Sequence, residues 1–314
     1  MDIRYGRKRN GIKRALNEKL DDWIDSISDT DVQDAINKDV IVTGGAIASM
    51  LLGEKVNDFD LYFKTKETTL KVAKYYVDKF NASHSLEVAN HVDAYKPEVR
   101  EVTKTNSKGE KEDRIVIWLQ SAGVAAEAQE EYTYFETLSE QEAIEFAESL
   151  AKQEESNKER YRPVFMSENA ITLSDKVQLV TRFYGEPDQI HDNYDFLHAT
   201  CYYDFNNQHL ELPAEALECL LSRTLVYRGS LYPVASIFRM KKFLERGWRI
   251  TAGQQLKIMW QISELDLRNF EVMREQLTGV DMAYMYQLIQ ALKDVDYEKI
   301  NSVYVASIID KIFD

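Results

Sequence analysis

The strongest constraint on how this chain folds is a short segment near residue 40, where an apolar run, two glycines, a helical stretch and an alternating stretch follow one another. Residues 41–42 are β-branched and apolar, and they lead through Thr43 into Gly44-Gly45. Residues 46–52 have helical composition and end at a glycine, and residues 58–63 alternate polar and apolar side chains. A strand, a glycine turn, a helix and a second strand in this order pack helices against a sheet. The segment therefore predicts an α+β or α/β head.

The rest of the chain is organised around this head. Its 314 residues, 44% of them hydrophobic, are enough for one large domain or two ordinary ones with a buried core. Periodicity predicts one or two entry helices within 15–37, an amphipathic helix at 68–80, strands at 114–119, 170–173, 177–183, 195–203 and 210–212, and successive helices after Pro213 apart from 224–227. We therefore expect an α+β fold with three regions: a basic helical extension (1–38), the head (39–212) with an insertion at about 104–169, and a helical region (213–314).

Charge is distributed unevenly along the chain, although the formal net charge is -14. Residues 127–160 hold eleven glutamates against three basic residues, and a capping box at Ser139 and Glu142 predicts an acidic helix over 139–160. This acidic insertion is a candidate surface for a protein partner. Residues 223–249 hold seven basic residues against one acidic residue, so a polyanion such as RNA is the expected partner there. The candidate RNA contacts are Arg239, Lys241, Lys242 and Arg246.

Other features of the sequence argue against a membrane-bound or secreted protein. No window approaches the roughly 18 to 20 consecutive apolar residues of a membrane helix, and no apolar stretch follows the basic N-terminus, which is expected to be a solvated, mobile end. Cys201 and Cys219 have neither CxxC nor metal-type spacing, which predicts small buried core residues. Sparse thiols favour a cytoplasmic location. His191 and His198 form no hydrolase-type motif and are interpreted as ordinary hydrogen-bonded histidines.

Two aspartates in the alternating stretch are candidate metal ligands. Asp58 and Asp60 are two residues apart on an expected strand, so their carboxylates share one face, as catalytic Mg²⁺ ions require. An isolated Asp-x-Asp is more often a turn or cap, but here Gly44 and Gly45 precede it at the start of an expected helix. Backbone amides at such a turn can cradle a triphosphate. The combination is much more specific than either half alone.

These residues resemble the head motif of the template-independent nucleotidyltransferases, the group in the DNA polymerase β superfamily that includes class II CCA-adding enzymes and bacterial poly(A) polymerases. Residues 43–53 read TGGAIASMLLG and residues 57–61 read NDFDL, against the family pattern GG-x-V-R-D-x-L-L-G followed by D-x-D. Ala48 and Ser49 stand where the family has Arg-Asp. The resemblance implies a twisted mixed sheet that holds Mg²⁺ and leads into an all-α, neck-like region.

Two further blocks follow in the order of this family. Residues 193–204 are similar to the family strand R-R-D-F-T-I-N-A-L-A-Y-D, with Asn193 and Tyr194 replacing both arginines and Ala199 at the asparagine position. Residues 232–250 resemble the start of the neck, D-P-L-R-I-L-R-A…G-F-R-I. Glu264 and Arg268 keep the i, i+4 spacing of the nucleotide-selecting motif of the neck, a spacing that is also typical of a helix-surface ion pair. These departures and the long insertion indicate a divergent variant, consistent with a virus-encoded protein in a host cytoplasm.

The main departure concerns the third carboxylate of the family, whose strand aligns with residues 177–182. Gln178 occupies that position. An amide oxygen can bind a metal ion, but an amide cannot act as a general base or add negative charge. Either Asp175 or Asp195 takes this role, or the chemistry is lost. Arg182, in the same stretch, is a candidate phosphate contact by position.

The resemblance thus implies Mg²⁺-dependent transfer of a nucleotide from an NTP to the 3′ hydroxyl of a tRNA-like or other RNA, or to another hydroxyl acceptor. Asp58 and Asp60 would hold the metal, Asp195 would complete the catalytic set, and Gly44, Gly45 and Arg182 would bind the nucleotide. The alternative is a catalytically silent protein that keeps the fold to bind nucleotide, RNA or a protein partner. Gln178 and the missing arginines favour this alternative. The sequence leaves the identities of the NTP and the acceptor open.

Overall fold

The computed structural model describes residues 6–83, 97–105, 111–118 and 160–276, together with 303, 304 and 306–308. The described residues divide between Ser222 and Arg223 into two compact units, which are considered separately below. Most of the acidic insertion, including the helix expected over 139–160 up to Glu159, lies outside the described residues.

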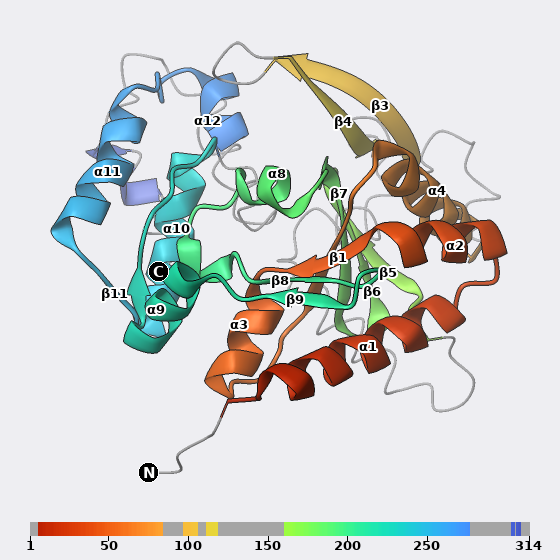
Figure 1. Cartoon of the computed structure of the whole chain (residues 1–314). Coiled ribbons are helices and arrows are strands. Elements are labelled where there is room, and N and C mark those ends of the chain that lie inside the picture. Colours follow the sequence, from red (N-terminus) through yellow and green to blue (C-terminus); the bar gives the residue numbers. More distant parts are fainter. Residues whose placement is uncertain are drawn as a thin grey trace, which may run out of the picture. The chain divides into compact units, whose positions relative to one another are not determined.

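The first unit is built on a seven-stranded mixed sheet, which confirms the mixed α and β architecture expected from the sequence (Figure 1). The strand order across the sheet is β5 (Pro163–Met166), β6 (Ala170–Leu173), β7 (Val177–Tyr184), β2 (Phe59–Phe63), β1 (Val40–Thr43), β8 (Tyr202–Asp204) and β9 (His209–Glu211). Only the pair β2–β7 is parallel among these strands; the others are antiparallel. The strands that carry the glycine turn and the Asp-x-Asp pair therefore lie side by side near the middle of the sheet.

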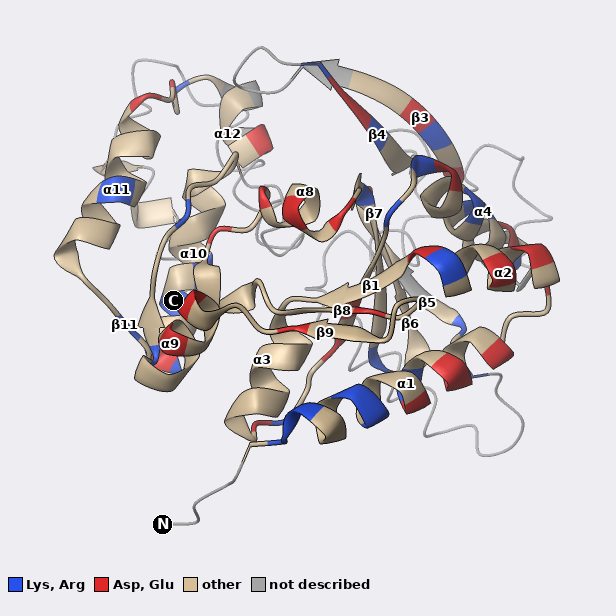
Figure 2. Cartoon of the chain, in the orientation of Figure 1, with Lys and Arg blue, Asp and Glu red and all other residues tan. Residues whose placement is uncertain are grey.

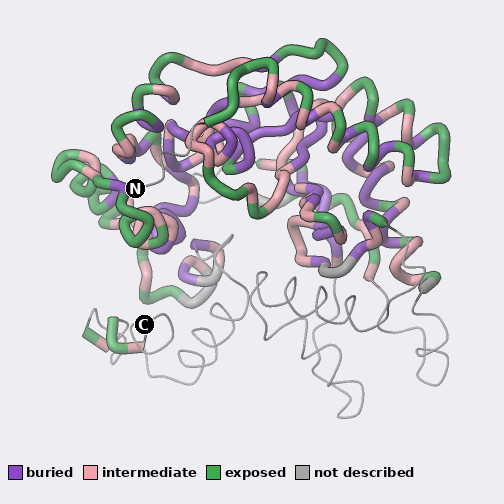
Figure 3. The backbone as a smooth tube through the Cα atoms, turned by 90° about the horizontal axis from the view of Figure 1, so that it is seen from below, coloured by how far each residue is buried: buried purple, intermediate pink, exposed green. Residues whose placement is uncertain are grey.

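Four helices of the N-terminal part supply much of the core of this unit. They are α1 (Arg9–Asp25), α2 (Thr30–Asp39), α3 (Gly45–Leu52) and α4 (Lys66–Ser83). In α1, Ile12, Leu16, Leu20 and Trp23 recur at helical spacing and are completely or almost completely buried. The Asp29 carboxylate caps α2 by accepting from the backbone amides of Asp31 and Val32. Figure 3 shows the resulting contrast between buried central strands and exposed outer helix surfaces.

The other side of the sheet is only partly covered. The short helix α8 (Pro187–His191) places Ile190 against Ile41 and Tyr62. Val180, Phe183, Tyr194 and Tyr202 pack around this cluster but remain partly exposed. Because side chains alternate along a strand, Asp60 and Thr43 lie on the same face as Tyr62 and Ile41. This half-open face therefore bears the candidate site.

Smaller elements complete the first unit. A hairpin of β3 (Glu98–Thr105) and β4 (Lys111–Trp118) forms a second, two-stranded antiparallel sheet. The strand expected at 195–203 is wrong for most of its length, because a 3-10 turn, η3 (Leu197–Ala199), occupies its centre. Thr200 stabilises this turn by donating both its backbone amide and its hydroxyl to the carbonyl of Leu197. Helix α9 (Ala214–Ser222) ends the unit.

The second unit is mainly helical, with α10 (Pro233–Glu245), α11 (Ala252–Ser263) and α12 (Phe270–Gln276). It also contains a short parallel pair of strands, β10 (Thr224–Leu225) and β11 (Arg249–Ile250), the second of which the sequence pattern did not predict. Glu264 and Arg268 do not share a helix, because α11 ends at Ser263 and the Arg268 amide donates to Asp266 in the following turn. The helical i, i+4 interpretation of that pair is therefore wrong. Within the described part of the chain, no helix is long and apolar enough to cross a membrane.

Candidate functional site

The site begins at the glycine turn between β1 and α3. Gly44 has φ 83°, a left-handed conformation that glycine adopts without strain. A Cβ at this position would lie 3.0 Å from Oδ2 of Asp60 and 3.5 Å from the hydroxyl of Tyr194. Gly45, by contrast, is exposed and has nothing within 4 Å of where a Cβ would stand. The turn therefore brings backbone against a carboxylate on one side and leaves the first turn of α3 open on the other.

The two aspartates lie at the start of β2, beside this turn. Asp60 faces Thr43 on one side and Gln178 on the other, because its Cα is in register with both residues. Asp58 stands one residue before the strand rather than within it, and both aspartates are half-buried. The sequence alignment that put Gln178 beside the Asp-x-Asp pair therefore agrees with the register of the parallel strands.

The donor atoms at this point suit a hard cation. Carboxylate and amide oxygens are ligands of Mg²⁺, which usually retains several water molecules in proteins. Within the described ranges no three histidine, cysteine, aspartate or glutamate side chains gather as a metal-binding group. Two carboxylates with a neutral amide beside them, rather than three acids, are what the structure offers. Such a set fits Mg²⁺ with less negative charge than a carboxylate triad.

A buried hydrogen-bond network holds the end of β1. The hydroxyl of Thr43 donates to the carbonyl of Cys201 at 2.9 Å and lies 2.8 Å from Nε2 of His191. Since a hydroxyl has one hydrogen, Nε2 of His191 is the donor in the second contact. The amide of Gly44 donates to the carbonyl of Ala199 at 3.2 Å. The interpretation of His191 as a hydrogen-bonded histidine is confirmed, and the network fixes the backbone that enters the glycine turn.

Tyr194 is the site residue that sequence patterns did not single out, beyond its replacing an arginine of the resembling family. Its ring lies 5.0 Å from that of His191 and 6.2 Å from that of Tyr62. Burial, with smaller effects of Tyr62 and Asp60, raises the pKa of Tyr194 well above its ordinary value. The group beside Gly44 and Asp60 is thus a neutral phenol. No local signal could have indicated this contact, because Tyr194 comes from a link far along the chain.

The remaining candidate residues of the first unit are Arg182, Asp195 and Asp175, and each has contacts or burial of its own. Arg182 is 6% exposed, with Nη1 3.5 Å from Oδ1 of Asn169 and its guanidinium over the ring of Phe183. The pairing of β7 with β2 shifts register between Leu179 and Tyr184, the stretch that contains Arg182. Asp195 is also buried, in the link between α8 and η3. The Asp175 carboxylate lies 3.8 Å from Arg160, at the turn between β6 and β7.

The candidate RNA contacts belong to the second unit. Arg239, Lys241 and Lys242 lie on α10, and Arg246 is the residue that caps its C-terminal end. Figure 2 shows the basic and acidic residues of the described elements in blue and red. Lys242 and Arg246 are exposed, whereas Arg239 and Lys241 are half-buried. Phe243 lies beneath Arg246, whose guanidinium is 5.8 Å from the ring centroid. The cysteines are both free and buried, as their spacing predicted.

Fold and site together define an α+β protein with an acidic pair beside a glycine turn on the half-open face of a mixed sheet. This chain belongs to the Gabija anti-defense 2 family, which it matches over residues 14–223. It is similar to the Gabija anti-defense 2 protein of Bacillus phage SPbetaL7, with 21% identity over 124 residues. That match covers 39% of this chain and 31% of the phage protein.

Solved structures of tRNA-processing enzymes also match. A CCA-adding enzyme in complex with CTP matches all of this chain at 13% identity and a TM-score of 0.42. A Thermotoga maritima CCA-adding enzyme complexed with tRNA matches 93% of this chain at 12% identity and a TM-score of 0.36. The matches cover 54% and 53% of these enzymes, so this chain spans about half of their length.

Proposed function

We propose that this protein transfers a nucleotide from an NTP to a hydroxyl acceptor, and that this reaction is how it acts against the Gabija defence. The acceptor oxygen forms a bond to the α-phosphorus, and the bond from that phosphorus to the β-phosphate breaks, so that pyrophosphate leaves. The observation that carries the proposal is the register of β1, β2 and β7. It places Asp60 between Thr43, which leads into the glycine turn, and Gln178. The glycine turn, which we propose as the phosphate cradle, and the acidic pair therefore lie at neighbouring points of the sheet.

Each part of the site has a chemical task in this reaction. The free amides at the start of α3, behind Gly44 and Gly45, bind the phosphates of the NTP. Asp58 and Asp60 hold Mg²⁺, and the amide oxygen of Gln178 is available as a neutral ligand. When bound there, Mg²⁺ would neutralise charge on the phosphates and orient the reacting groups. The hydroxyl of Tyr194, next to Gly44, donates to a bound phosphate in place of a cation.

The hydroxyl that receives the nucleotide must lose its proton to a general base. Gln178 cannot take it, and Asp175 lies beside Arg160 in a separate turn. Our candidate base is Asp195, which is buried and directly follows Tyr194, the residue whose hydroxyl lies beside Gly44. Arg182 is our candidate for a further phosphate contact. For the acceptor we propose an RNA 3′ end received by Arg239, Lys241, Lys242 and Arg246. A protein hydroxyl is the other acceptor to be tested.

The membership of the family connects this chemistry to a biological role. The name of the family states an action against a defence, and one member is encoded by a Bacillus phage. We therefore propose that the acceptor is a component or product of the host, modified in the host cytoplasm. The acidic insertion 127–160 is proposed as the surface that meets a protein partner.

Label transfer tests the reaction directly. The purified protein is incubated with Mg²⁺, each α-labelled NTP in turn, and total RNA or protein from a host cell. We expect one NTP to label one class of acceptor, and we expect Asp60→Asn to abolish labelling. Asp25→Asn, which changes an exposed aspartate at the end of α1, is the matched control and should label like the wild type. Labelling that survives in Asp60→Asn would contradict the assignment of the site.

A second candidate function is a silent protein that binds nucleotide without transferring it. The neutral Gln178 opposite Asp60 is the observation that favours it. Gln178→Glu separates the two candidates, since it adds a carboxylate with almost no change in volume. For an active enzyme we expect a higher Mg²⁺ affinity and faster transfer in this variant. Nucleotide-dependent stabilisation without transfer, in both the wild type and Gln178→Glu, would establish the silent protein.

A further inference from the structure

The turn that joins β6 to β7 has an unusual backbone. Asp175 and Lys176, in the 3-10 turn η2 (Ser174–Lys176), have φ 62° and 64°. Side chains other than glycine strain the backbone in this region by about 1–2 kcal/mol per residue, although aspartate tolerates it better than lysine. Such strain persists only where the surrounding structure holds the residues in place. The contacts of these two residues are therefore informative.

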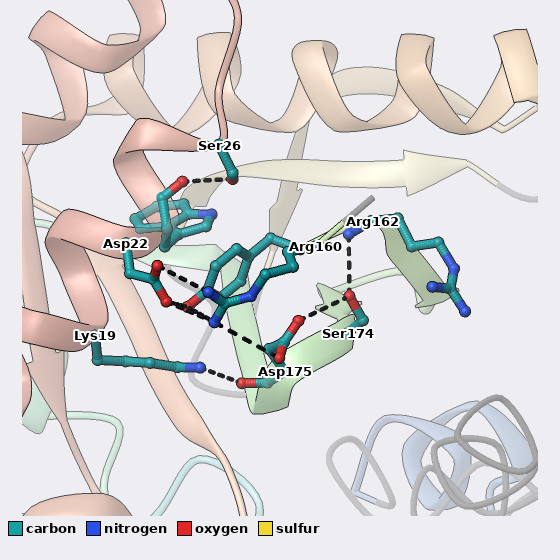
Figure 4. Close-up of polar contacts among 9 residues, drawn as sticks. Lys19, Asp22, Ser26, Arg160, Arg162, Ser174 and Asp175 are labelled. Atoms are coloured by element: carbon teal, nitrogen blue, oxygen red, sulfur yellow. Dashed lines mark hydrogen bonds and ion pairs between the residues drawn. The ribbon is translucent and has the colours of Figure 1, made fainter. Parts of the chain in front are cut away.

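Two lysines make those contacts, and Figure 4 shows the one made by Lys19. Lys176 donates from Nζ to the carbonyl of Val56 at 3.2 Å. Lys19, on α1, donates to the carbonyl of Asp175 and lies over the rings of Tyr161 and Phe59, at 4.7 and 5.5 Å from their centroids. Burial lowers the pKa of Lys19, partly offset by Asp175. Both lysines therefore connect the turn to the segment that enters β2.

That segment carries the acidic pair. Val56 is two residues before Asp58, and Phe59 stands between Asp58 and Asp60. On the other side of the turn, β7 starts directly after Lys176, with Val177 paired to Phe59 and Gln178 paired to Asp60. The strained turn thus contacts the loop before Asp58 and sets the start of the strand beside Asp60.

A second set of contacts fixes the turn from outside. Arg160 pairs with Asp22 and lies 3.8 Å from the carboxylate of Asp175. The Tyr161 hydroxyl donates to Asp22 at 2.9 Å, and the Ser174 hydroxyl lies 3.4 Å from Asp175. The turn is therefore tied to α1 through side chains as well as through its backbone carbonyl.

We propose that Lys176, braced by Lys19, is a positioning residue for Asp58 and Asp60. By holding the carbonyl of Val56, it fixes the backbone of residues 56–60. The two carboxylates of this segment are thereby held in the orientation that binds one cation. This inference rests on the proposed function only for the assignment of Asp58 and Asp60 as the metal-binding pair. The role assigned to Lys176 is to hold the Val56 carbonyl, not to bind the ion or the nucleotide.

Glycine substitutions separate positioning from stability. Lys176→Gly removes the amine and also relieves the left-handed strain, so its melting temperature should equal or exceed that of the wild type. Its affinity for Tb³⁺, measured by luminescence and by competition with Mg²⁺, should fall about 10-fold, the lower end of the effect of residues that orient metal ligands. Lys176→Arg, which can still reach a carbonyl, should restore most of the affinity.

Asp175→Gly is the matched control. It relieves the same kind of strain at the neighbouring position. It removes only the two long contacts of the Asp175 carboxylate, 3.8 Å to Arg160 and 3.4 Å to Ser174, and keeps both the backbone carbonyl that Lys19 contacts and the Lys176 contact with Val56. We expect its Tb³⁺ affinity to stay within 2-fold of the wild type. Wild-type affinity in Lys176→Gly would overturn the proposal, as would a loss of affinity accompanied by a matching loss of stability. If Asp60→Asn binds Tb³⁺ as well as the wild type, the metal site of the proposed function is itself wrong.

Discussion

At the scale of single residues, the two glycines of the turn differ in what they permit. Gly44 combines a left-handed backbone with a carboxylate oxygen 3.0 Å from its missing Cβ, whereas the space around Gly45 is open. A side chain is therefore tolerated at position 45 of the turn but not at position 44. This difference separates a steric requirement from a general preference for glycine.

We expect Gly44→Ala to destabilise the protein by about 1–2 kcal/mol, because an alanine at φ 83° is strained and displaces Asp60. Nucleotide-dependent stabilisation in thermal melts should be lost with it. Gly45→Ala is the matched control and should leave both the melting temperature and the nucleotide response near those of the wild type. Equal effects of the two substitutions would contradict the geometry of the turn.

His198 gives the stability a dependence on pH. It is 3% exposed, and burial lowers its pKa to about 4 from an ordinary value of 6.5. Between these values the unfolded chain binds the proton that the folded chain excludes, so stability falls as the pH falls. From pH 7 to pH 5 we expect a loss of about 2 kcal/mol from this group.

Urea unfolding at the two pH values measures this loss in the wild type and in His198→Gln. The variant should show a smaller difference between pH 7 and pH 5. His209→Gln, at an exposed histidine, should keep the wild-type difference. A difference that is unchanged in His198→Gln would show that other groups cause the acid response.

At the scale of elements, the sequence predicted best where one rule dominates. The alternation of residues 58–63 and the glycines around 46–52 define β2 and α3, because both patterns reflect burial on one face. The prediction of a strand over 195–203 was wrong because a hydrogen bond from Thr200 to the carbonyl of Leu197 stabilises a turn there. Apolar composition does not indicate such a bond. The sequence did not predict β11, because a strand of two residues is too short to show a periodic pattern.

The site could be predicted to a similar degree. Gly44, Asp58, Asp60 and Gln178 follow from motif spacing and from strand alignment. The phenol of Tyr194 and the lysine anchor at Val56 could not be inferred, because each joins segments distant in the sequence. Local patterns indicate which elements form, whereas such contacts depend on how the elements pack.

The helix α10 carries a prediction of its own. Lys242 and Arg246 are exposed at its C-terminal end, and reversing both to glutamate should weaken RNA binding and reduce its dependence on salt. Filter binding at several salt concentrations measures both effects. As a control for net charge, Lys38→Glu and Lys74→Glu together reverse two exposed lysines of the first unit. If the control variant loses as much affinity as the α10 variant, the surface is not specific.

At the scale of the whole molecule, the proposed reaction should be visible in infected cells. A host that carries the Gabija defence and expresses this protein should support plating of a phage that the defence restricts. Asp60→Asn, expressed at the same level, should lose this effect if nucleotide transfer is the cause. Full protection of the phage by Asp60→Asn would instead show that binding is sufficient.

The order of strands in the sheet has a consequence for how the protein is made. β1 and β2 emerge from the ribosome early, but the strands that flank them, β8 and β7, come from much later in the chain. Until then the early pair of β1 and β2 has two unpaired edges, which are prone to associate with other chains. The acidic pair also exists in the nascent chain without Gln178. A partly synthesised chain should therefore depend on chaperones and bind no nucleotide until β7 and β8 have joined the sheet.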